Sequence, residues 1–525
     1  MDLEAAFHAL PGLTEREAQR RMAAAVAEAL ERQVPLLVHA PTGVGKSLGY
    51  LVPIVAAGRR AIVATATKAL QSQLVERDLP RLAEAFDTTF ALAMGRANYA
   101  CWARMEALVA ATRLADHAAD LYGVTVTAAR MARAGAAADA AAKAAGMRTD
   151  WSRRLRGRFQ ELAADLHPGP VLPGGRAHAT LVAAFTPLAN DLQTMLGTLG
   201  TLKDRGDPDD EATALLAARR RLRALARDLE RLVTTPVRPG GTADTPEADL
   251  AVWVEQGRGG ARVVRSALVE PGPVLDGVLW SRVPATVACS ATLAVAGSLA
   301  VAARTLGVAQ PATVVAASPF DFGRNALLYV PRGVPQPSSD GFQAAAEREL
   351  VSLIEASQGR ALVLCTSWRA VESFAAALAH LPYEVLVQGD DVPARLAARF
   401  RDEVASVLVA TRTFFEGFDV PGESLSLLVL DRLPFPRPDD PLLAERGRRV
   451  EAAGASRFAD VWLPAAAVSL QQALGRLVRS ETDRGVMAVL DRRLADAGYR
   501  AELLASLPPA RLTRSMEDVR AFLAV

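Results

Sequence analysis

The sequence predicts an α/β protein with two domains, each of which contains a parallel β-sheet flanked by helices. Two mainly helical insertions interrupt the first domain. Short apolar runs rich in β-branched residues alternate with helical stretches, which is typical of parallel sheets. The runs fall into two sets, one that ends near residue 75 and resumes near residue 284, and one that extends from about residue 326 to the end. At 525 residues the chain is also too long for one ordinary hydrophobic core.

The first set begins with a helix and a buried strand. Residues 14–32 are rich in alanine and start with Thr14, a helix start signal, so we expect a helix there. The runs VPLLVHA at 34–40 and RAIVATAT at 60–67 have the length and composition of buried strands. A further run of this set, ATVACSATL, stands at 285–293 after the insertions.

The second set contains the strands expected for the second domain. Helical stretches separate many of these runs, which again favours parallel pairing. The runs are RALVLCTS at 360–367, YEVLVQG at 383–389, SVLVATR at 406–412, LSLLVLD at 425–431 and VMAVLD at 486–491.

The region between the two parts of the first set has a different composition. Residues 102–168 are rich in alanine and arginine and helical in pattern, and GPVLPGG at 169–175 is a joint rich in helix breakers. Residues 186–233 are expected to be helical, and 235–247 reads as a loop or linker. The leucines at helical spacing are Leu215, Leu222, Leu225, Leu229 and Leu232.

Charge and cysteine content limit the class of protein. Lys plus Arg (60) nearly balances Asp plus Glu (58), which excludes a uniformly basic coat and restricts any nucleic-acid surface to a local patch. The three cysteines, Cys101, Cys289 and Cys365, are far apart and form no disulfide framework, which fits a reducing compartment. Cys289 and Cys365 lie in apolar runs and are expected to be buried. We expect a soluble, cytoplasmic protein without a membrane segment, because no apolar run reaches about 18 residues.

The segment APTGVGKS at 40–47 matches a phosphate-binding loop, except that Ala40 replaces the first glycine. Glycines let backbone N–H groups turn towards phosphate oxygens, and the helix expected to begin near Lys46 adds its positive end. Lys46 is expected to neutralise the β- and γ-phosphates of ATP, and Ser47 to place its hydroxyl on Mg²⁺. The expected nucleotide contacts in the loop are Thr42, Gly43, Gly45, Lys46 and Ser47.

A second motif, LQQALGRLVRS at 470–480, lies in the second domain. Its Gln472, Gly475, Arg476 and Arg479 have the spacing QxxGRxxR. This spacing places two guanidinium groups near one helical face, where they could stabilise charge on a transferring γ-phosphoryl group. The two motifs together predict a nucleotide held between two domains, with Gln472, Arg476 and Arg479 as candidate catalytic residues.

The motifs of both domains together resemble superfamily 2 helicases, which have two RecA-like motor domains, and the details are similar to the DinG branch, related to XPD. Arg16 and Gln19 in LTEREAQRRM match the Q motif, which reads adenine in that family. TATKALQSQL at 65–74 resembles motif Ia, in which Thr65, Thr67 and Gln71 would face the nucleic-acid backbone.

Three further stretches carry the same resemblance. SATL at 290–293 is similar to motif III, with Ser290 and Thr292 as expected DNA contacts, and SPFDF at 318–322 resembles a stretch of DinG. ATRTFFEGFDVPG at 410–422 resembles motif V. The resemblance assigns DNA contact to Thr411 and the nucleotide to Glu416, Gly417 and Asp419.

The resemblance implies an ATP-dependent motor that moves 5′ to 3′ on single-stranded DNA and opens duplex or R-loop DNA. Backbone phosphate contacts, rather than base contacts, would dominate its binding. The domains it implies are RecA-like domain 1 at 1–101, an insertion of the iron–sulfur type at 102–170, a degenerate motif II region at 171–185, a helical arch-like insertion at 186–265, the end of domain 1 at 266–318, and domain 2 at 319–525.

The chain departs from the family at the iron–sulfur cluster, which needs four cysteine thiolates. Residues 102–168 contain no cysteine, so no cluster is expected. The end of this insertion instead gathers Arg153, Arg154 and Arg156, together with Arg148 and Arg158, around Trp151 and Phe159. This mixture suits DNA phosphate contact with base stacking, but it equally suits a solvated helix face with two core aromatics.

Relatives without the cluster resemble helicases attached to type IV CRISPR systems, often called CasDinG, which act with a complex guided by crRNA. The missing cysteines and the compact length favour such a partner. The alternative is a free-standing DNA-repair helicase of the DinG type.

A second departure concerns motif II, an Asp-Glu-x-His box that holds Mg²⁺ and positions the attacking water. The register we expect is VLPGGRAHATL at 171–181, where Gly175-Arg176-Ala177-His178 replaces the acidic box; the nearest acids are Asp165 and Asp191. Three interpretations follow: a carboxylate from elsewhere in domain 1, a different register, or an adaptor that binds ATP and DNA without hydrolysis. The intact loop and paired arginines favour a working motor.

Overall fold

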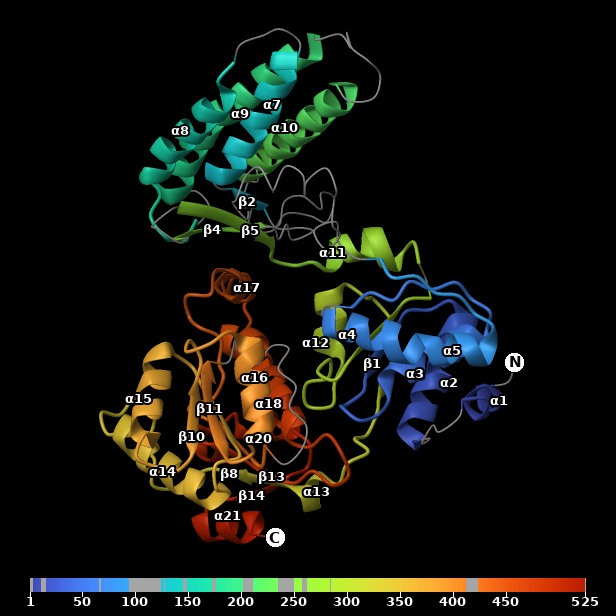
Figure 1. Ribbon diagram of the computed structural model, residues 1–525, viewed down its shortest axis with the longest axis vertical. Coiled ribbons are helices and arrows are strands. Elements are labelled where there is room, and N and C mark those ends of the chain that lie inside the picture. The colour runs from blue at the N-terminus through green and yellow to red at the C-terminus, as the bar shows by residue number, and fades with distance from the viewer. Residues whose placement is uncertain are drawn as a thin grey trace. The chain divides into compact units, whose positions relative to one another are not determined.

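A computed structural model gives the fold, with two units that are described separately (Figure 1). The α/β unit comprises Met1–Ala93, Leu275–Pro436 and Trp462–Val525, and the insertion unit comprises Met94–Val274 and Arg437–Val461. The structure describes residues 3–10, 16–65, 68–93, 124–126, 128–144, 149–171, 176–201, 211–234, 250–256, 262–283, 285–411 and 424–524. No helix in these ranges is both long enough and apolar enough to cross a membrane.

The α/β unit contains two parallel sheets, and the smaller one carries the phosphate-loop motif. Its strand order is β6-β1-β7, with β1 (Leu36–His39) in the centre, β6 (Val287–Ser290) on one side and β7 (Ala312–Val315) on the other. The apolar residues of β1 are buried, as expected for a central parallel strand. Its helical elements are α1 (Leu3–His8), α2 (Glu17–Arg32), α3 (Lys46–Ala56), α4 (Lys68–Gln73), α5 (Leu79–Phe86) and α12 (Ala300–Leu306), with π-helical turns η1 (Leu74–Asp78) and η4 (Asp276–Trp280). The short helix α11 (Gly272–Leu275) spans the boundary between the two units.

The helix expected at 14–32 is confirmed over its described part, because α2 buries one face at helical spacing through Met22, Val26 and Ala29. The strand expected at 60–67 is not formed over the described residues 60–65. Those residues pair with no strand, and Ile62 is 98% exposed. An apolar run becomes a strand only where a neighbouring strand accepts its backbone hydrogen bonds.

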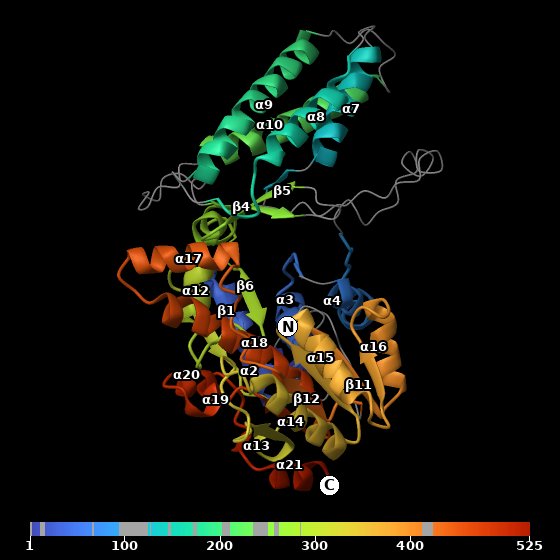
Figure 2. The same ribbon diagram turned by 90° about the vertical axis from the view of Figure 1, so that its left-hand side faces the viewer.

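Over the described residues the larger sheet has seven parallel strands in the order β10-β11-β9-β12-β13-β8-β14, and Figure 2 labels β11 and β12 among them. The strands are β8 (Ala326–Tyr329), β9 (Ala361–Cys365), β10 (Glu384–Val387), β11 (Ser406–Thr411), β12 (Leu427–Leu430), β13 (Gly485–Val489) and β14 (Arg511–Thr513). All five runs predicted for the second domain therefore contain strands, and the predicted α/β class is confirmed. The helical elements are α13 (Phe322–Asn325), α14 (Phe342–Ser357), α15 (Trp368–Leu378), α16 (Pro393–Asp402), α18 (Leu463–Leu477), α19 (Arg493–Asp496), α20 (Arg500–Ala505) and α21 (Met516–Leu523), with the π-helical turn η6 (Phe458–Trp462) at the unit boundary.

One face of this sheet forms the main core of the α/β unit. Buried side chains of α14, α15 and α21, among them Leu350, Phe374 and Val519, pack against the central strands. On the strands, Val363 and Val429 belong to the same core. The central strands are apolar along their length because helices cover a parallel sheet.

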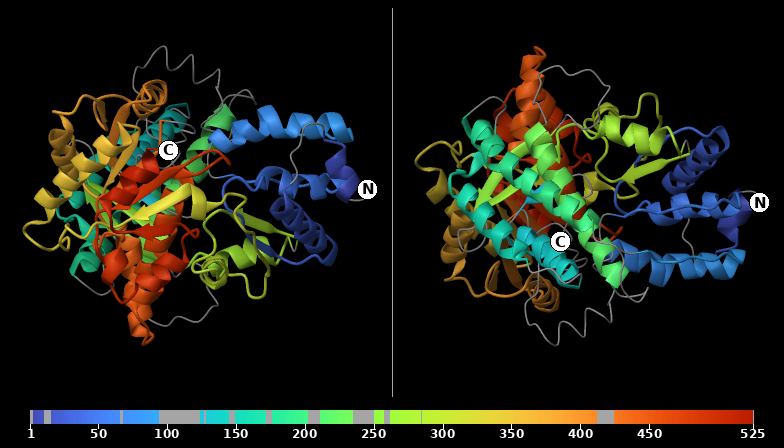
Figure 3. Two further views of the ribbon diagram at one scale, coloured as in Figure 1. Left: turned by 90° about the horizontal axis from the view of Figure 1, so that it is seen from below. Right: turned by 90° about the horizontal axis from the view of Figure 1, so that it is seen from above.

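The insertion unit is a helical bundle with a small antiparallel sheet (Figure 1), and the view from above in Figure 3 shows its teal and green helices. Its helices are α7 (Ala128–Ala144), α8 (Trp151–Ala164), α9 (Arg176–Thr201), α10 (Glu211–Thr234) and α17 (Pro441–Ala452). The strand order is β2-β5-β4-β3, formed by β2 (Val124–Val126), β5 (Arg262–Leu268), β4 (Leu250–Gln256) and β3 (Gly169–Pro170). The expected leucine stripe is confirmed at Leu222, Leu225, Leu229 and Leu232, which are buried in the bundle core.

Two expectations about this region need correction. Residues 176–185 lie in α9 of the insertion unit, not in domain 1. Arg437–Val461, which we assigned to domain 2, groups with the insertion unit, where Arg446 Nε donates to the Val269 carbonyl at 2.8 Å.

Trp151 and Phe159 are buried in the bundle core, which confirms the alternative of two core aromatics rather than base-stacking side chains.

Candidate nucleotide-binding site

The phosphate loop joins the end of β1 to the start of α3, as the motif predicts. Gly43 and Gly45 have φ angles of +84° and +83°, which side-chain-bearing residues adopt only with strain. A Cβ atom on Gly45 would stand 2.3 Å from Gln19 Nε2, and one on Gly43 would stand 2.0 Å from the Phe320 ring. Both glycines are therefore required by backbone conformation and by close packing.

The two Q-motif residues hold the backbone of this loop. Gln19, which is 3% exposed, donates from Nε2 to the Gly45 carbonyl at 2.9 Å. Arg16 donates to the Gly43 carbonyl, and its guanidinium lies 5.9 Å from the centroid of the Phe320 ring. Adenine recognition by Arg16 and Gln19 stays a prediction, whereas their role in shaping the loop follows from these contacts.

Lys46 lies at the centre of the loop. Its Nζ donates to the carbonyls of Ala40 and Pro41, each at 3.1 Å, which positions the ammonium group inside the turn. Burial lowers the pKa of Lys46, and the nearby Cys289 thiol acts in the opposite direction. An anion at this helix start would gain both the ammonium group and free backbone N–H groups.

The residues behind Lys46 belong to the two neighbouring strands. Burial raises the pKa of Cys289 to about 11, although Lys46 acts to lower it. Burial also lowers the pKa of His39, and Lys46 adds to this effect. His39 Nδ1 accepts a hydrogen bond from the Ala294 backbone N–H at 3.1 Å, which links the end of β1 to the segment after β6. Sequence reasoning missed His39, because a lone histidine at a strand end carries no motif signal.

Motif III follows β6. Ser290 Oγ and Thr292 Oγ1 lie 3.3 Å apart, and the Thr292 N–H donates to Ser290 Oγ at 3.3 Å. The two side chains thus stabilise the turn itself, and DNA contact by Ser290 and Thr292 stays a prediction.

Ser47 lies in the first turn of α3, and Tyr50 follows it three residues later. Burial raises the pKa of Tyr50, whose hydroxyl is hydrogen-bonded to Ser47. The negative charge of Asp78 raises the same pKa, so this carboxylate lies within electrostatic reach of the helix start. Asp78 is 3% exposed and accepts hydrogen bonds from Gln73 at 3.3 Å and from Arg77 at 3.0 Å.

The described residues of the expected motif II register belong to the insertion unit. Arg176 and His178 are in the first turn of α9, in the other unit. Asp191 is also in α9, where it pairs with Arg158. Among the described residues, no group of three His, Cys, Asp or Glu side chains could hold a metal ion.

The second motif meets the phosphate loop. Thr42 Oγ1 donates to the Gly475 carbonyl of α18 at 3.3 Å. Burial lowers the pKa of Arg476 and of Arg479, and both remain cationic because a guanidinium group titrates far above neutral pH. The geometry brings the QxxGRxxR motif to the loop, as predicted.

Two details of this motif differ from expectation. α18 ends at Leu477, so Arg479 lies beyond the helix, where its backbone N–H donates to Asp483 at 2.7 Å. Gln472 is exposed, whereas its neighbour Gln471 donates to the carbonyls of Ala294 at 2.8 Å and Ser506 at 2.6 Å. Gln471 thus connects the segment after β6 to the second α/β domain, a role that the motif spacing did not reveal.

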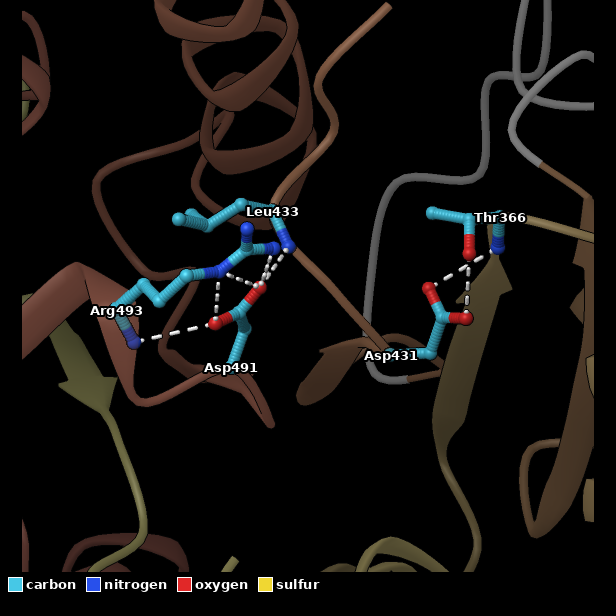
Figure 4. A network of polar contacts seen from close by, with 5 residues as sticks. All are labelled: Thr366, Asp431, Leu433, Asp491 and Arg493. Carbon is cyan, nitrogen blue, oxygen red and sulfur yellow. Dashed lines mark hydrogen bonds and ion pairs between the residues drawn. The ribbon is translucent and has the colours of Figure 1, made fainter. Parts of the chain in front are cut away.

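Polar anchors stand at the carboxyl edge of the seven-stranded sheet (Figure 4). Asp431, which is 2% exposed, accepts hydrogen bonds from the N–H of Thr366 at 3.0 Å and from its hydroxyl at 2.8 Å. Burial raises the pKa of Asp431, and the hydrogen bonds from Thr366 act in the opposite direction. Asp491 accepts from the Leu433 N–H at 3.1 Å and pairs with Arg493.

The DNA contacts expected from the sequence are spread over both units. Thr411 is buried and donates from its N–H and hydroxyl to Gln388 Oε1, at 2.7 and 2.9 Å. Thr65 follows the unpaired run at 60–64, and Gln71 lies in α4. Arg153, Arg154 and Arg156 are exposed on α8. Thr67, Glu416, Gly417 and Asp419 lie outside the described residues.

The cysteines do not fit an iron–sulfur cluster. The whole chain has three, and a cluster of this kind takes four thiolates. Cys365 is buried in β9, as expected, whereas Cys289 in β6 is partly buried.

The chain is similar to helicases along its length. Residues 17–115 match the DEAD/DEAH box helicase family, and residues 350–510 match the helicase C-terminal domain family. The chain is 34% identical to "ATP-dependent helicase DinG" of Mycobacterium tuberculosis, with 98% of this chain and 95% of that protein covered. It is 29% identical to "ATP-dependent DNA helicase YoaA" of Escherichia coli, with coverage of 98% and 97%.

Solved structures share the fold. "Structure of S. tokodaii Xpd4" has a TM-score of 0.55 at 14% identity, with 95% of this chain and 100% of that chain covered. "XPD_APO" also has a TM-score of 0.55, at 13% identity, with 94% and 99% covered. These similarities confirm two RecA-like domains.

The comparison with the Escherichia coli relative also locates a difference in length. The alignment spans 632 positions and 97% of that relative, whereas this chain has 525 residues. More than a hundred positions of the relative therefore have no counterpart in this chain. Because the alignment reaches nearly both ends of both proteins, these gaps lie within the aligned region. Internal segments are thus missing relative to this homologue.

Proposed function

The chain belongs to the DinG family of ATP-dependent helicases, and from that premise we propose that it uses ATP, bound at the phosphate loop, to move along single-stranded DNA and open duplexes. The observation that carries the proposal is the hydrogen bond between Thr42 and the Gly475 carbonyl. It joins the nucleotide loop of one RecA-like domain to the arginine motif of the other. A nucleotide at this position would contact both domains, so its binding and release would change their separation.

Each residue of the site has a distinct role in binding the nucleotide or stabilising its transfer. Lys46 and the backbone N–H groups of the loop hold the phosphates, while Gln19 and Arg16 hold the loop in shape. Arg476 and Arg479 supply positive charge that stabilises the transferring phosphoryl group. Ser47 fits as one oxygen ligand of Mg²⁺, which, when bound with ATP, would neutralise phosphate charge.

The carboxylate that activates water in related motors has no counterpart at the expected register. Its absence would reduce turnover on the order of 10²-fold, the usual contribution of general-base catalysis. We therefore expect slow hydrolysis that depends on single-stranded DNA. The rival proposal, an adaptor that binds ATP and DNA without hydrolysis, rests on the same missing group.

Steady-state ATP hydrolysis separates these two proposals. Wild-type protein is measured with and without single-stranded DNA beside Lys46→Ala and a matched control, Lys143→Ala, which removes an exposed lysine from α7. The motor proposal expects turnover that DNA stimulates, that Lys143→Ala retains and that Lys46→Ala loses. Wild-type turnover no higher than that of Lys46→Ala would establish the adaptor instead.

The direction of movement and the cellular partner are finer proposals. Movement from 5′ to 3′ is expected by analogy with the family and is measured with partial duplexes that carry a single-stranded tail at one end. Partnership with a crRNA-guided type IV CRISPR complex is supported by the low cysteine count and the short chain. The similarity to DinG and YoaA supports the alternative, a free-standing helicase, and neighbouring genes without crRNA-handling functions would decide for it.

A further inference from the structure

A groove runs between α9 and α10 of the insertion unit, which pack side by side (Figure 2). Its volume is about 770 Å³. One wall comes from α9 and the other from α10, and the lining residues are Gln193, Leu196, Gly197, Arg223, Ala226 and Arg227. None of them belongs to the nucleotide site.

The two arginines share one wall of the groove. Arg223 and Arg227 are four residues apart on α10, so they lie on the same face, about 5 to 6 Å apart at their Cβ atoms. Both are exposed, and the structure records no hydrogen bond or ion pair for either guanidinium in the part of the chain it describes.

Other arginines of the same unit have structural partners. Arg130 pairs with Asp228, and Arg158 pairs with Asp191. Arg219, one turn before Arg223, donates from Nε to the Leu199 carbonyl at 3.1 Å and thereby links α10 to α9. Arg223 and Arg227 therefore contribute little to holding the bundle together, and their charge is available to a ligand.

The rest of the groove suits an extended chain. Gly197 faces open space, since a Cβ atom built on it would meet nothing within 4 Å. Ala226 is buried in the bundle core and, with Leu196, provides an apolar floor. Gln193 offers an amide on the wall opposite the arginines. The groove thus combines two neighbouring positive charges with a narrow apolar surface.

We propose that this groove binds single-stranded DNA, with Arg223 and Arg227 contacting adjacent phosphates of one strand. The inference rests on the proposed function, which requires the protein to hold such a strand. It adds a second contact region outside the RecA-like domains and distinct from the Arg153, Arg154 and Arg156 patch on α8. Phosphate contacts of this kind give affinity without sequence preference.

The test compares Arg223→Ala/Arg227→Ala with Arg221→Ala in the full-length protein. Arg221 is exposed on the same helix and does not line the groove, so it controls for loss of positive charge. Binding of a labelled oligothymidine is measured by fluorescence anisotropy over a range of salt concentrations. Circular dichroism verifies that each variant keeps its helix content.

Each phosphate contact on a single strand contributes about 0.7 to the slope of log affinity against log salt. The double variant should therefore lose about 1.4 from the slope, and the affinity gap to wild type should shrink about sevenfold between about 50 and about 200 mM salt. Arg223→Lys/Arg227→Lys should restore most of the slope, because lysine carries the same charge. Arg221→Ala should reduce the salt slope clearly less than the double variant does.

The outcomes separate failure of the proposed function from failure of the groove assignment. Failure of the wild-type protein to bind oligothymidine would refute the proposed function itself. Binding by wild type, with the double variant matching Arg221→Ala in affinity and slope, would overturn the groove assignment alone. If the double variant binds DNA as the wild type does but no longer binds polyglutamate, the DNA assignment of the groove is also overturned, and the groove is assigned to an acidic polypeptide.

Discussion

The two parallel sheets of the α/β unit differ in size over the described residues. The sheet behind the phosphate loop has three strands there, and the sheet of the second domain has seven. The second sheet buries its apolar strands under helices, whereas described residues of the first domain leave Ile62, Phe90 and Leu92 at least 39% exposed. The nucleotide loop is therefore held by a small sheet and by contacts from α2 and α18, rather than by a large surrounding core.

This contrast fits the length difference from the homologues. Positions that the Escherichia coli relative has and this chain lacks fall inside the alignment. Residues 60–64 have strand composition, and within the described part of the chain they pair with no strand.

The largest expected effect compares a buried and an exposed aliphatic residue. Leu428→Ala, in the central strand β12, should reduce the free energy of unfolding by about 2 to 5 kcal/mol, because it leaves a cavity in a closely packed core. Ile62→Ala should change it by less than about 0.5 kcal/mol, since the side chain is 98% exposed. Hydrogen exchange of peptides from each domain measures the two values. Equal losses of unfolding free energy in the two variants would show that the Ile62 side chain is packed in solution, and would contradict the difference in burial between the two domains.

The second prediction concerns the polar anchor of the larger sheet. Asp431→Asn should reduce the free energy of unfolding by about 1 to 3 kcal/mol at neutral pH, because the asparagine amide cannot accept both hydrogen bonds from Thr366. A raised folded-state pKa means that the folded protein binds the proton more tightly, so the stability that it contributes is present at low pH and is lost as pH rises through that pKa.

The wild-type protein should therefore gain stability relative to Asp431→Asn as pH falls from neutral towards about 4, near the unfolded pKa of aspartate. Denaturation curves of both proteins over this range provide the measurement. A difference that shrinks on acidification would contradict the assigned direction of the shift.

The third prediction tests the link between the two sheets. Gln471→Ala removes two hydrogen bonds to backbone carbonyls and should cost about 1 to 3 kcal/mol of domain association. Gln336→Ala is the control, because Gln336 is an exposed glutamine outside the nucleotide site, and it should be close to neutral. ATP affinity measured by fluorescence titration should fall for Gln471→Ala only. Equal affinities would show that Gln471 does not position the nucleotide site.

The candidate site was predictable where one short segment carries it. The loop from Gly43 to Ser47 depends on local backbone conformation and on a strand followed by a helix, which sequence periodicity reveals. The paired arginines were recognisable by their spacing. The roles of Gln471 and His39 were not, because each depends on a carbonyl or N–H group far away in the chain.

Residue patterns within short segments were enough to predict the α/β class, the strands of the second domain, the phosphate loop and the resemblance to helicases. The three-dimensional contacts were needed to show that the described residues 60–64 pair with no strand, that Arg176 and His178 lie in a helix of the insertion unit, and that Trp151 is buried in its core. Strand pairing and burial depend on contacts between segments that are far apart in the chain, and a local residue pattern does not contain that information.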